Sequence, residues 1–115
     1  MRGDLLTKKL DKIDSFMPCC IEAFDETDRK LIIDISKALG NEARFEIYSF
    51  LRMSNACMTG DLVNHLPLAQ STISQHMKVL KKAGVIEGII EGTSTNYCIN
   101  RENMQRYYQL LGQMV

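Results

Sequence analysis

The stretch QSTISQHMKVLKKAG, residues 70–84, decides the fold. Its apolar residues Ile73, Met77 and Leu80 are spaced i, i+4 and i+7, which places them on one face of an α-helix. The other face is polar and basic, and Gly84 is a typical helix-ending residue. The stretch therefore predicts an amphipathic helix over residues 70–83, with one side packed on a core and the other exposed.

The segments on either side of this helix indicate its structural class. The tight segment LPLA at residues 66–69 separates it from a short preceding helix, which Thr59 is expected to cap. Residues 85–99 contain two runs of β-branched or aromatic residues around the loop EGTST, as expected of a two-stranded hairpin. A helix, a turn, a second helix and a hairpin form a winged helix-turn-helix, whose second helix enters the DNA major groove.

Length and composition fit one domain. The chain has 115 residues and is 45% hydrophobic, which suits a single mainly α domain with a β-hairpin wing over residues 1–115. Amphipathic helices are predicted at both ends, over residues 4–17 and 101–113. A chain this short covers its apolar stripes incompletely, so we expect a homodimer that packs through these end helices. The residues expected at that interface are Leu10, Ile13, Tyr107 and Leu111.

Two central helices carry capping signals. The segment DETD at residues 25–28 supplies capping oxygens and negative charge to the first turn of one helix. Gly40 is expected to end that helix, and Asn41 is expected to cap the next one. Both helices are therefore predicted from local signals alone.

The charge distribution matters more than the net charge. The chain has 14 basic and 14 acidic side chains and a formal net charge of zero, which argues against a polycation that coats nucleic acid or membrane. Between Pro67 and Val85, however, there is no Asp or Glu, whereas Lys78, Lys81 and Lys82 lie on or near the predicted helix. With no membrane-spanning run and no signal peptide, we expect a cytoplasmic protein that does not bind membranes.

The polar face of the predicted helix is suited to DNA. Its front carries short donors and acceptors that can meet base edges or phosphates. The candidate DNA-binding residues are Gln70, Ser71, Thr72, Ser74, Gln75, His76, Lys78 and Lys82. A polar helix face can also be merely solvated, but the order of helix, turn, helix and hairpin favours DNA binding.

Two segments resemble those of the ArsR/SmtB metalloregulatory repressors: KALGNEAR at residues 37–44 and STISQHMKVLKKAG at residues 71–84. The resemblance runs from about residue 28 to residue 111. It implies a homodimer that binds double-stranded operator DNA and leaves it when a toxic metal or metalloid binds. One departure is that the family usually has Ser, Gln and Pro where this chain has Ala69, Gln70 and Ser71, so we expect Ser71 to cap the helix instead.

The four cysteines suggest soft-metal ligands, redox sensors or small hydrophobic residues in a reducing compartment. Cys19 and Cys20 are adjacent and follow the helix-ending Pro18, and a disulfide between neighbours would be strained. Both can turn towards one soft ion, and a third thiolate would complete a trigonal set for trivalent arsenic or antimony. The third ligand is Cys57, in the loop before the helix pair, or Cys98, in a wing strand, and we favour Cys57.

The family resemblance sharpens this expectation. One branch of the family combines a vicinal N-terminal cysteine pair of one subunit with a cysteine before the helix pair of the other, and Cys19, Cys20 and Cys57 resemble that arrangement. It implies As(III) or Sb(III) as inducer, with other thiophilic ions as alternatives. The family's zinc-type site needs Asp and His on the last helix, which residues 101–115 lack.

Several functions remain as alternatives. The chain has no Gly-rich phosphate loop, no metalloprotease His pair and no Cys-x-x-Cys motif, so we do not expect an enzyme. The alternatives are a thiol-redox-responsive repressor, a Cd(II) or Pb(II) sensor of the same fold, and a winged-helix module that binds protein. Comparing arsenite with peroxide distinguishes the first, and salt-dependent affinity distinguishes DNA binding from the last.

Overall fold

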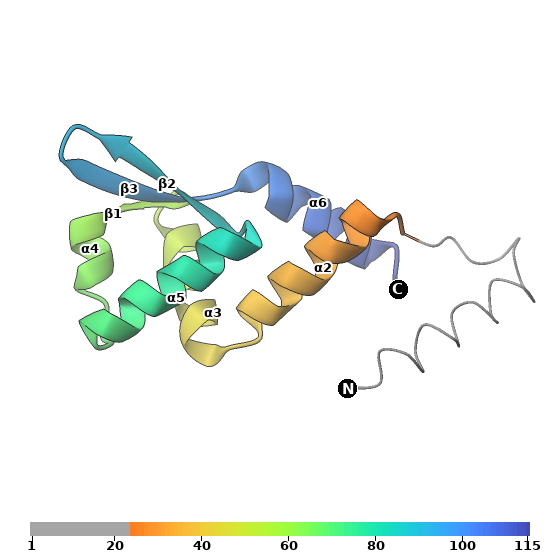
Figure 1. Ribbon diagram of the computed structural model, residues 1–115, viewed down its shortest axis with the longest axis horizontal. Helices are drawn as coiled ribbons and strands as arrows, with labels where there is room; N and C mark the ends of the chain where they lie inside the picture. The colour runs from red at the N-terminus through yellow and green to blue at the C-terminus, as the bar shows by residue number, and fades with distance from the viewer. Residues whose placement is uncertain (1–23) are drawn as a thin grey trace, which may run out of the picture.

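The computed structural model describes residues 24–115. The helix expected over residues 4–17, together with Cys19 and Cys20, lies outside the described residues. The elements are α2 (Glu26–Leu39), α3 (Glu42–Met53), β1 (Cys57–Thr59), α4 (Gly60–Asn64), α5 (Gln70–Ala83), β2 (Ile86–Glu91), β3 (Ser94–Ile99) and α6 (Arg101–Gly112). Figure 1 shows the strands, α4 and most of α5 at one end of the described part, and α2 beside α6 at the other. This is a winged helix-turn-helix, with α4 and α5 as the helix pair and β2 and β3 as the wing.

The predicted helix caps are present in α2 and α3. A side-chain oxygen of Asp25 accepts a hydrogen bond from the backbone N–H of Asp28 at 2.7 Å. The amide oxygen of Asn41 accepts one from the backbone N–H of Arg44 at 3.2 Å. Gly84 ends α5 with a φ of 85°, a left-handed conformation that glycine adopts without steric cost.

Helix α5 begins without a side-chain cap. Ala69 occupies the N-cap position with an extended backbone, φ −62° and ψ 139°, and makes no side-chain capping bond. The prediction that Ser71 caps the helix is wrong, because the helix starts at Gln70 and Ser71 already lies in its first turn. Helix α5 is thus capped at its C-terminal end by Gly84 but has no side-chain cap at its start.

One hydrophobic core joins the helices to the base of the wing. The three residues predicted from the 70–84 pattern, Ile73, Met77 and Leu80, are buried in it. Helix α2 contributes Ile35 and Ala38. The remaining buried members of the core are Ile47, Tyr48, Leu51, Ala56, Met58, Val63, Val85, Ile86, Ile99, Met104 and Tyr107. The buried side of α5 therefore leaves its polar side facing outward.

Three tyrosines at the edge of the core make hydrogen bonds through their hydroxyl groups. Tyr107, expected at a dimer interface, is only 7% exposed and its hydroxyl hydrogen-bonds with Ser36 Oγ at 2.9 Å, so it belongs to the chain's own core. Tyr108 is half exposed, and its hydroxyl bonds with that of the buried Tyr48 at 2.9 Å. Burial, followed by this hydrogen bond, raises the pKa of Tyr48 well above its ordinary value.

The sheet has three antiparallel strands in the order β1-β3-β2, one strand more than the predicted two-stranded wing. Residues 57–59 were expected to form the end of a loop and a helix cap, but they pair with β3. The predicted five-residue hairpin loop shortens to a two-residue turn, because Glu91 pairs with Ser94 and Gly92 adopts a φ of 63°. Within residues 24–115, no helix is long and apolar enough to cross a membrane.

Candidate nucleic-acid interface and thiol pair

The eight predicted DNA-binding residues all lie on α5. Thr72 and His76 are partly buried, and the other six are exposed. The first turn of α5 contains no acidic residue, and its last turn carries Lys81 and Lys82. The outer side of this helix is therefore polar and cationic, as a surface that approaches DNA phosphates requires.

His76 has a second set of contacts that the sequence did not indicate. Arg44 of α3 donates from Nε to the backbone oxygen of Ala38 at 2.7 Å, and its Nη1 lies 3.3 Å from His76 Nδ1. Because a guanidinium can only donate, Nδ1 of His76 is the acceptor in this contact. Arg44 thus links His76 of α5 to α3 and, through the Ala38 carbonyl, to the end of α2.

A hollow of about 240 Å³ is lined by side chains of α4, α5 and the wing strand β3. Ser74, Lys78 and Lys81 line it from α5 at positions i, i+4 and i+7, and Tyr97 lines it from β3. Lys81, which was not among the predicted DNA-binding residues, extends its Nζ towards Gly88 of β2. It places a cation between the helix and the wing.

The wing itself is not cationic. Strands β2 and β3 contain Glu87 and Glu91, both exposed, and no Lys or Arg. The hairpin tip offers hydroxyl and amide groups from Thr93, Ser94 and Thr95 instead. Between α5 and the strands of the wing, the cationic side chains therefore lie on α5 alone.

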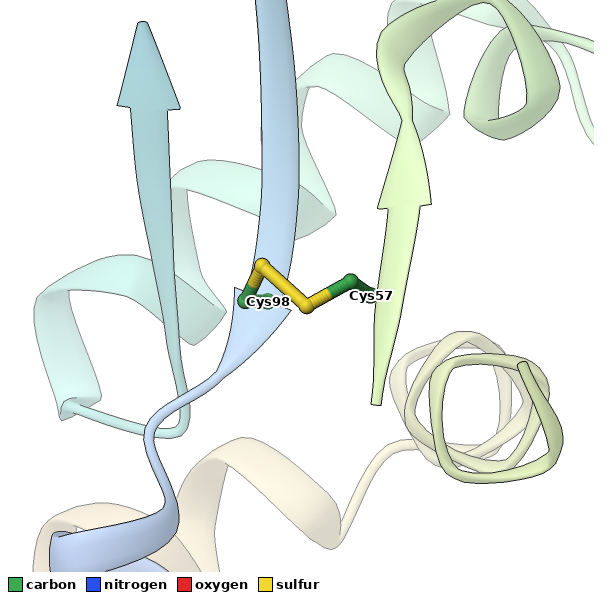
Figure 2. The surroundings of a disulfide bond; sticks show 2 residues. All are labelled: Cys57 and Cys98. Carbon is green, nitrogen blue, oxygen red and sulfur yellow. A yellow bond between two sulfur atoms is a disulfide. The ribbon is translucent and has the colours of Figure 1, made fainter. Parts of the chain in front are cut away.

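The two cysteines considered as alternative third ligands are brought together by the sheet. Cys57 of β1 and Cys98 of β3 are register partners with Cα atoms 4.0 Å apart, and a disulfide joins them (Figure 2). Cys57 is exposed, whereas Cys98 is only 9% exposed. In this bonded state neither sulfur is a thiolate that can bind a soft ion. In the described part of the chain, no three His, Cys, Asp or Glu side chains lie where they could share a metal ion.

The backbone before Cys57 adopts an uncommon conformation. Asn55 and Ala56 have φ values of 58° and 70°, in the left-handed region that non-glycine residues seldom occupy. The carbonyl of Ala56 accepts a hydrogen bond from the backbone N–H of Ile99 at 2.7 Å. This bond and the β1–β3 ladder hold the turn in place.

Comparison with known proteins agrees with the fold. A model of the arsR family of bacterial regulatory proteins matches residues 41–87. An uncharacterized HTH-type transcriptional regulator of Methanocaldococcus jannaschii is 30% identical over 81 residues, which cover 70% of this chain and 91% of that protein. The transcriptional activator HlyU of Vibrio cholerae is 27% identical over 94 residues, covering 82% and 85%. An ArsR-like transcriptional regulator from Rhodococcus sp. RHA1 has the same fold, with a TM-score of 0.63, 23% identity and coverage of 73% and 78%.

Proposed function

The chain belongs to the ArsR/SmtB family of transcriptional regulators, and from this premise we propose that it is a metalloid-responsive repressor. As a homodimer it binds double-stranded operator DNA, and it releases the DNA when As(III) or Sb(III) binds cysteine thiolates. Its relatives are named transcriptional regulators, and this chain is likewise a regulator and not an enzyme. The direction of regulation does not follow from the relatives, because one of them, HlyU, is named an activator. Repression is therefore part of the proposal.

Helix α5 is the DNA-reading element in this proposal. Ser74 and Gln75 contact base edges, and Lys78 and Lys82 contact phosphates. The exposure of these four residues and the absence of acidic residues from the first turn of α5 support this assignment. Lys81, beside the hollow next to the wing, is added to the phosphate-binding set.

The dimer forms through the N-terminal segment and the face shared by α2 and α6. Exposed apolar side chains on this part of the chain support the assignment, among them Ile33 on α2 and Tyr108 on α6, which are 42% and 50% exposed. Tyr108 takes the place of Tyr107, which the core buries. In this proposal the Cys19–Cys20 pair of one chain and Cys57 of the other form an intersubunit site, as the family resemblance suggests.

The observation that carries the metalloid proposal is the position of Cys57. It is exposed and begins β1, and β1 runs directly into Gly60, the first residue of α4. An ion held by Cys19, Cys20 and Cys57 as thiolates would link the N-terminal segment to the first helix of the DNA-reading pair. For release, the ion must bind the DNA-free arrangement more tightly, with a coupling of roughly 1 to 3 kcal/mol.

The test is release of labelled operator DNA, followed by fluorescence anisotropy while arsenite is added to fully reduced protein. Cys19→Ser, Cys20→Ser and Cys57→Ser should each keep DNA binding and lose most of the arsenite response. Cys98→Ser is the matched control and should release DNA normally.

Because the proposal names Cys57 as the third ligand, the responses of Cys57→Ser and Cys98→Ser to arsenite distinguish it from Cys98. If Cys57→Ser responds like the parent chain while Cys98→Ser does not, the third ligand is Cys98. A normal response from all four variants would refute metalloid sensing by thiolates. Parallel titrations with antimonite, Cd(II) and Pb(II) identify the preferred ion.

A further inference from the structure

We propose that Cys57 and Cys98 form a reversible dithiol–disulfide modification site that small thiols and disulfides enter through Cys57. A second part, which rests on the function proposed above, is that the disulfide withholds Cys57 from the metalloid. The oxidised chain therefore binds its operator but does not respond to arsenite.

The sheet holds the two cysteines opposite each other independently of the covalent bond. On one side of the pair, Met58 pairs with Tyr97 and Thr59 with Asn96. On the other side, the Ile99 N–H donates to the Ala56 carbonyl at 2.7 Å. These contacts do not involve sulfur, so reduction leaves the register intact and the two thiols remain within bonding range. The bond can therefore re-form within one chain.

Access to the pair is asymmetric. Cys57 lies on an edge strand and is exposed. Cys98 lies on the central strand, flanked by Cys57 on β1 and Glu87 on β2, and is 9% exposed. A small molecule in solution therefore reaches the Cys57 sulfur first, and Cys98 acts as the resolving thiol.

The chemistry is thiol–disulfide exchange with a small disulfide such as oxidised glutathione. The Cys57 thiolate attacks one glutathione sulfur, forming a mixed disulfide and releasing one glutathione thiolate. The Cys98 thiolate then attacks the Cys57 sulfur, which forms the protein disulfide and releases the second glutathione thiolate. The protein loses two electrons and two protons, and one glutathione disulfide becomes two glutathione thiols. A dithiol reductant reduces the protein disulfide by two exchange steps of the same kind and itself becomes a cyclic disulfide.

The bond affects the DNA-reading elements and the metalloid ligand differently. Its two ends are 41 residues apart, and α4, α5 and β2 all lie between them. Because neither cysteine lies on α5, and because we expect the β1–β3 register to be kept on reduction, operator affinity should change little. The Cys57 sulfur, in contrast, has no free thiolate while it is bonded to Cys98.

The first test follows the thiols by intact-protein mass spectrometry, in a chain that also carries Cys19→Ser and Cys20→Ser. With oxidised glutathione this chain should lose two hydrogens and retain no glutathione. Adding Cys98→Ser should trap one glutathione on Cys57, roughly tenfold faster than Cys98 is modified when Cys57→Ser is added instead. Equal rates, or a glutathione retained when both Cys57 and Cys98 are present, would overturn the site.

The second test measures operator binding and arsenite release for the oxidised and reduced parent chain. Without arsenite, the oxidised and reduced forms should bind the operator equally. When arsenite is added, only the reduced form should release it. Cys98→Ser should respond to arsenite in the reduced form. After oxidised glutathione it should lose the response, because the glutathione trapped on Cys57 also removes that thiolate, and a dithiol reductant should restore it. Release by oxidation alone, or release of the oxidised parent by arsenite, contradicts the second part.

The two proposals fail separately. If arsenite releases none of the reduced proteins, the metalloid function is wrong and the claim that the disulfide blocks it falls with it. The modification site then stands or falls on the mass spectra alone.

Discussion

The uncapped start of α5 can be repaired by a single substitution at Ala69. The first N–H groups of a helix have no partner within the helix, and a Ser, Thr, Asp or Asn side chain at the N-cap accepts a bond from one of them. Ala69 already has the extended backbone of an N-cap residue and is exposed. Ala69→Ser therefore adds an acceptor oxygen without rearranging the chain or filling the core.

The expected gain follows from measured capping effects. Exchanging Ala for Ser at an N-cap stabilises a protein by about 1 kcal/mol. With an unfolding entropy of about 2.1 cal/mol/K per residue, the 115 residues of the chain give about 0.24 kcal/mol/K. Ala69→Ser should then raise the Tm by about 4 °C at constant protein concentration.

Three variants at Ala69 separate capping from charge. Ala69→Asp should stabilise at least as much as Ala69→Ser, because its carboxylate also lies at the positive end of the helix dipole. It should weaken operator binding, since it adds a negative charge where α5 approaches phosphates, whereas Ala69→Ser should not. Ala69→Val fits the same backbone without an acceptor and is the control. If Ala69→Ser melts no higher than Ala69→Val, or if Ala69→Asp binds the operator as well as the parent does, this reasoning is refuted.

The structure supports three further predictions. The free energy of unfolding in urea should be up to about 4 kcal/mol higher for the oxidised chain than for the reduced chain, because the Cys57–Cys98 bond closes a loop of 41 residues. The stability of Cys57→Ser should not depend on reductant, and equal stability of the two parent forms would contradict the estimate. Lys78→Ala should weaken binding to all DNA sequences and lower the salt slope by about 1, whereas Gln75→Ala should cost about 1 to 3 kcal/mol only at particular bases; an equal loss on random DNA would show that Gln75 does not read sequence. Burial raises the pKa of Tyr48, so above pH 10 the folded chain keeps a proton that the unfolded chain loses, and the free energy of unfolding should fall as the pH rises there. Tyr48→Phe should reduce that fall, and a pH profile identical to that of the parent chain would contradict this prediction.

Within residues 24–115, local signals predicted the helices well. The apolar spacing of residues 70–84 depends only on neighbouring residues, and α5 spans Gln70–Ala83 with the expected buried face. The caps at Asp25 and Asn41 likewise need only a polar side chain and an N–H three residues later. Where two adjacent residues shared an apolar stripe, as Tyr107 and Tyr108 do, only the packed structure decided which one is buried.

Contacts between distant segments were not predictable in the same way. Strand β1 has three residues, too few for a period of two to be recognised, and its partner strand lies about 40 residues later. Nothing near Cys57 in the sequence indicates that Cys98 lies opposite it. The two cysteines therefore stood as alternatives, although the sheet makes them partners.

The distribution of charge explains how a chain with no net charge can still be built to approach DNA at one end. The outer side of α5 carries its three lysines without a compensating acid on that helix, whereas the adjoining strands carry only Glu87 and Glu91. In the proposed complex with DNA, phosphates would be attracted to α5 and repelled by the two glutamates of β2. In that complex the wing would contribute through the uncharged side chains at its tip, Thr93, Ser94 and Thr95. Such contacts are short-ranged and add selectivity for position rather than general attraction.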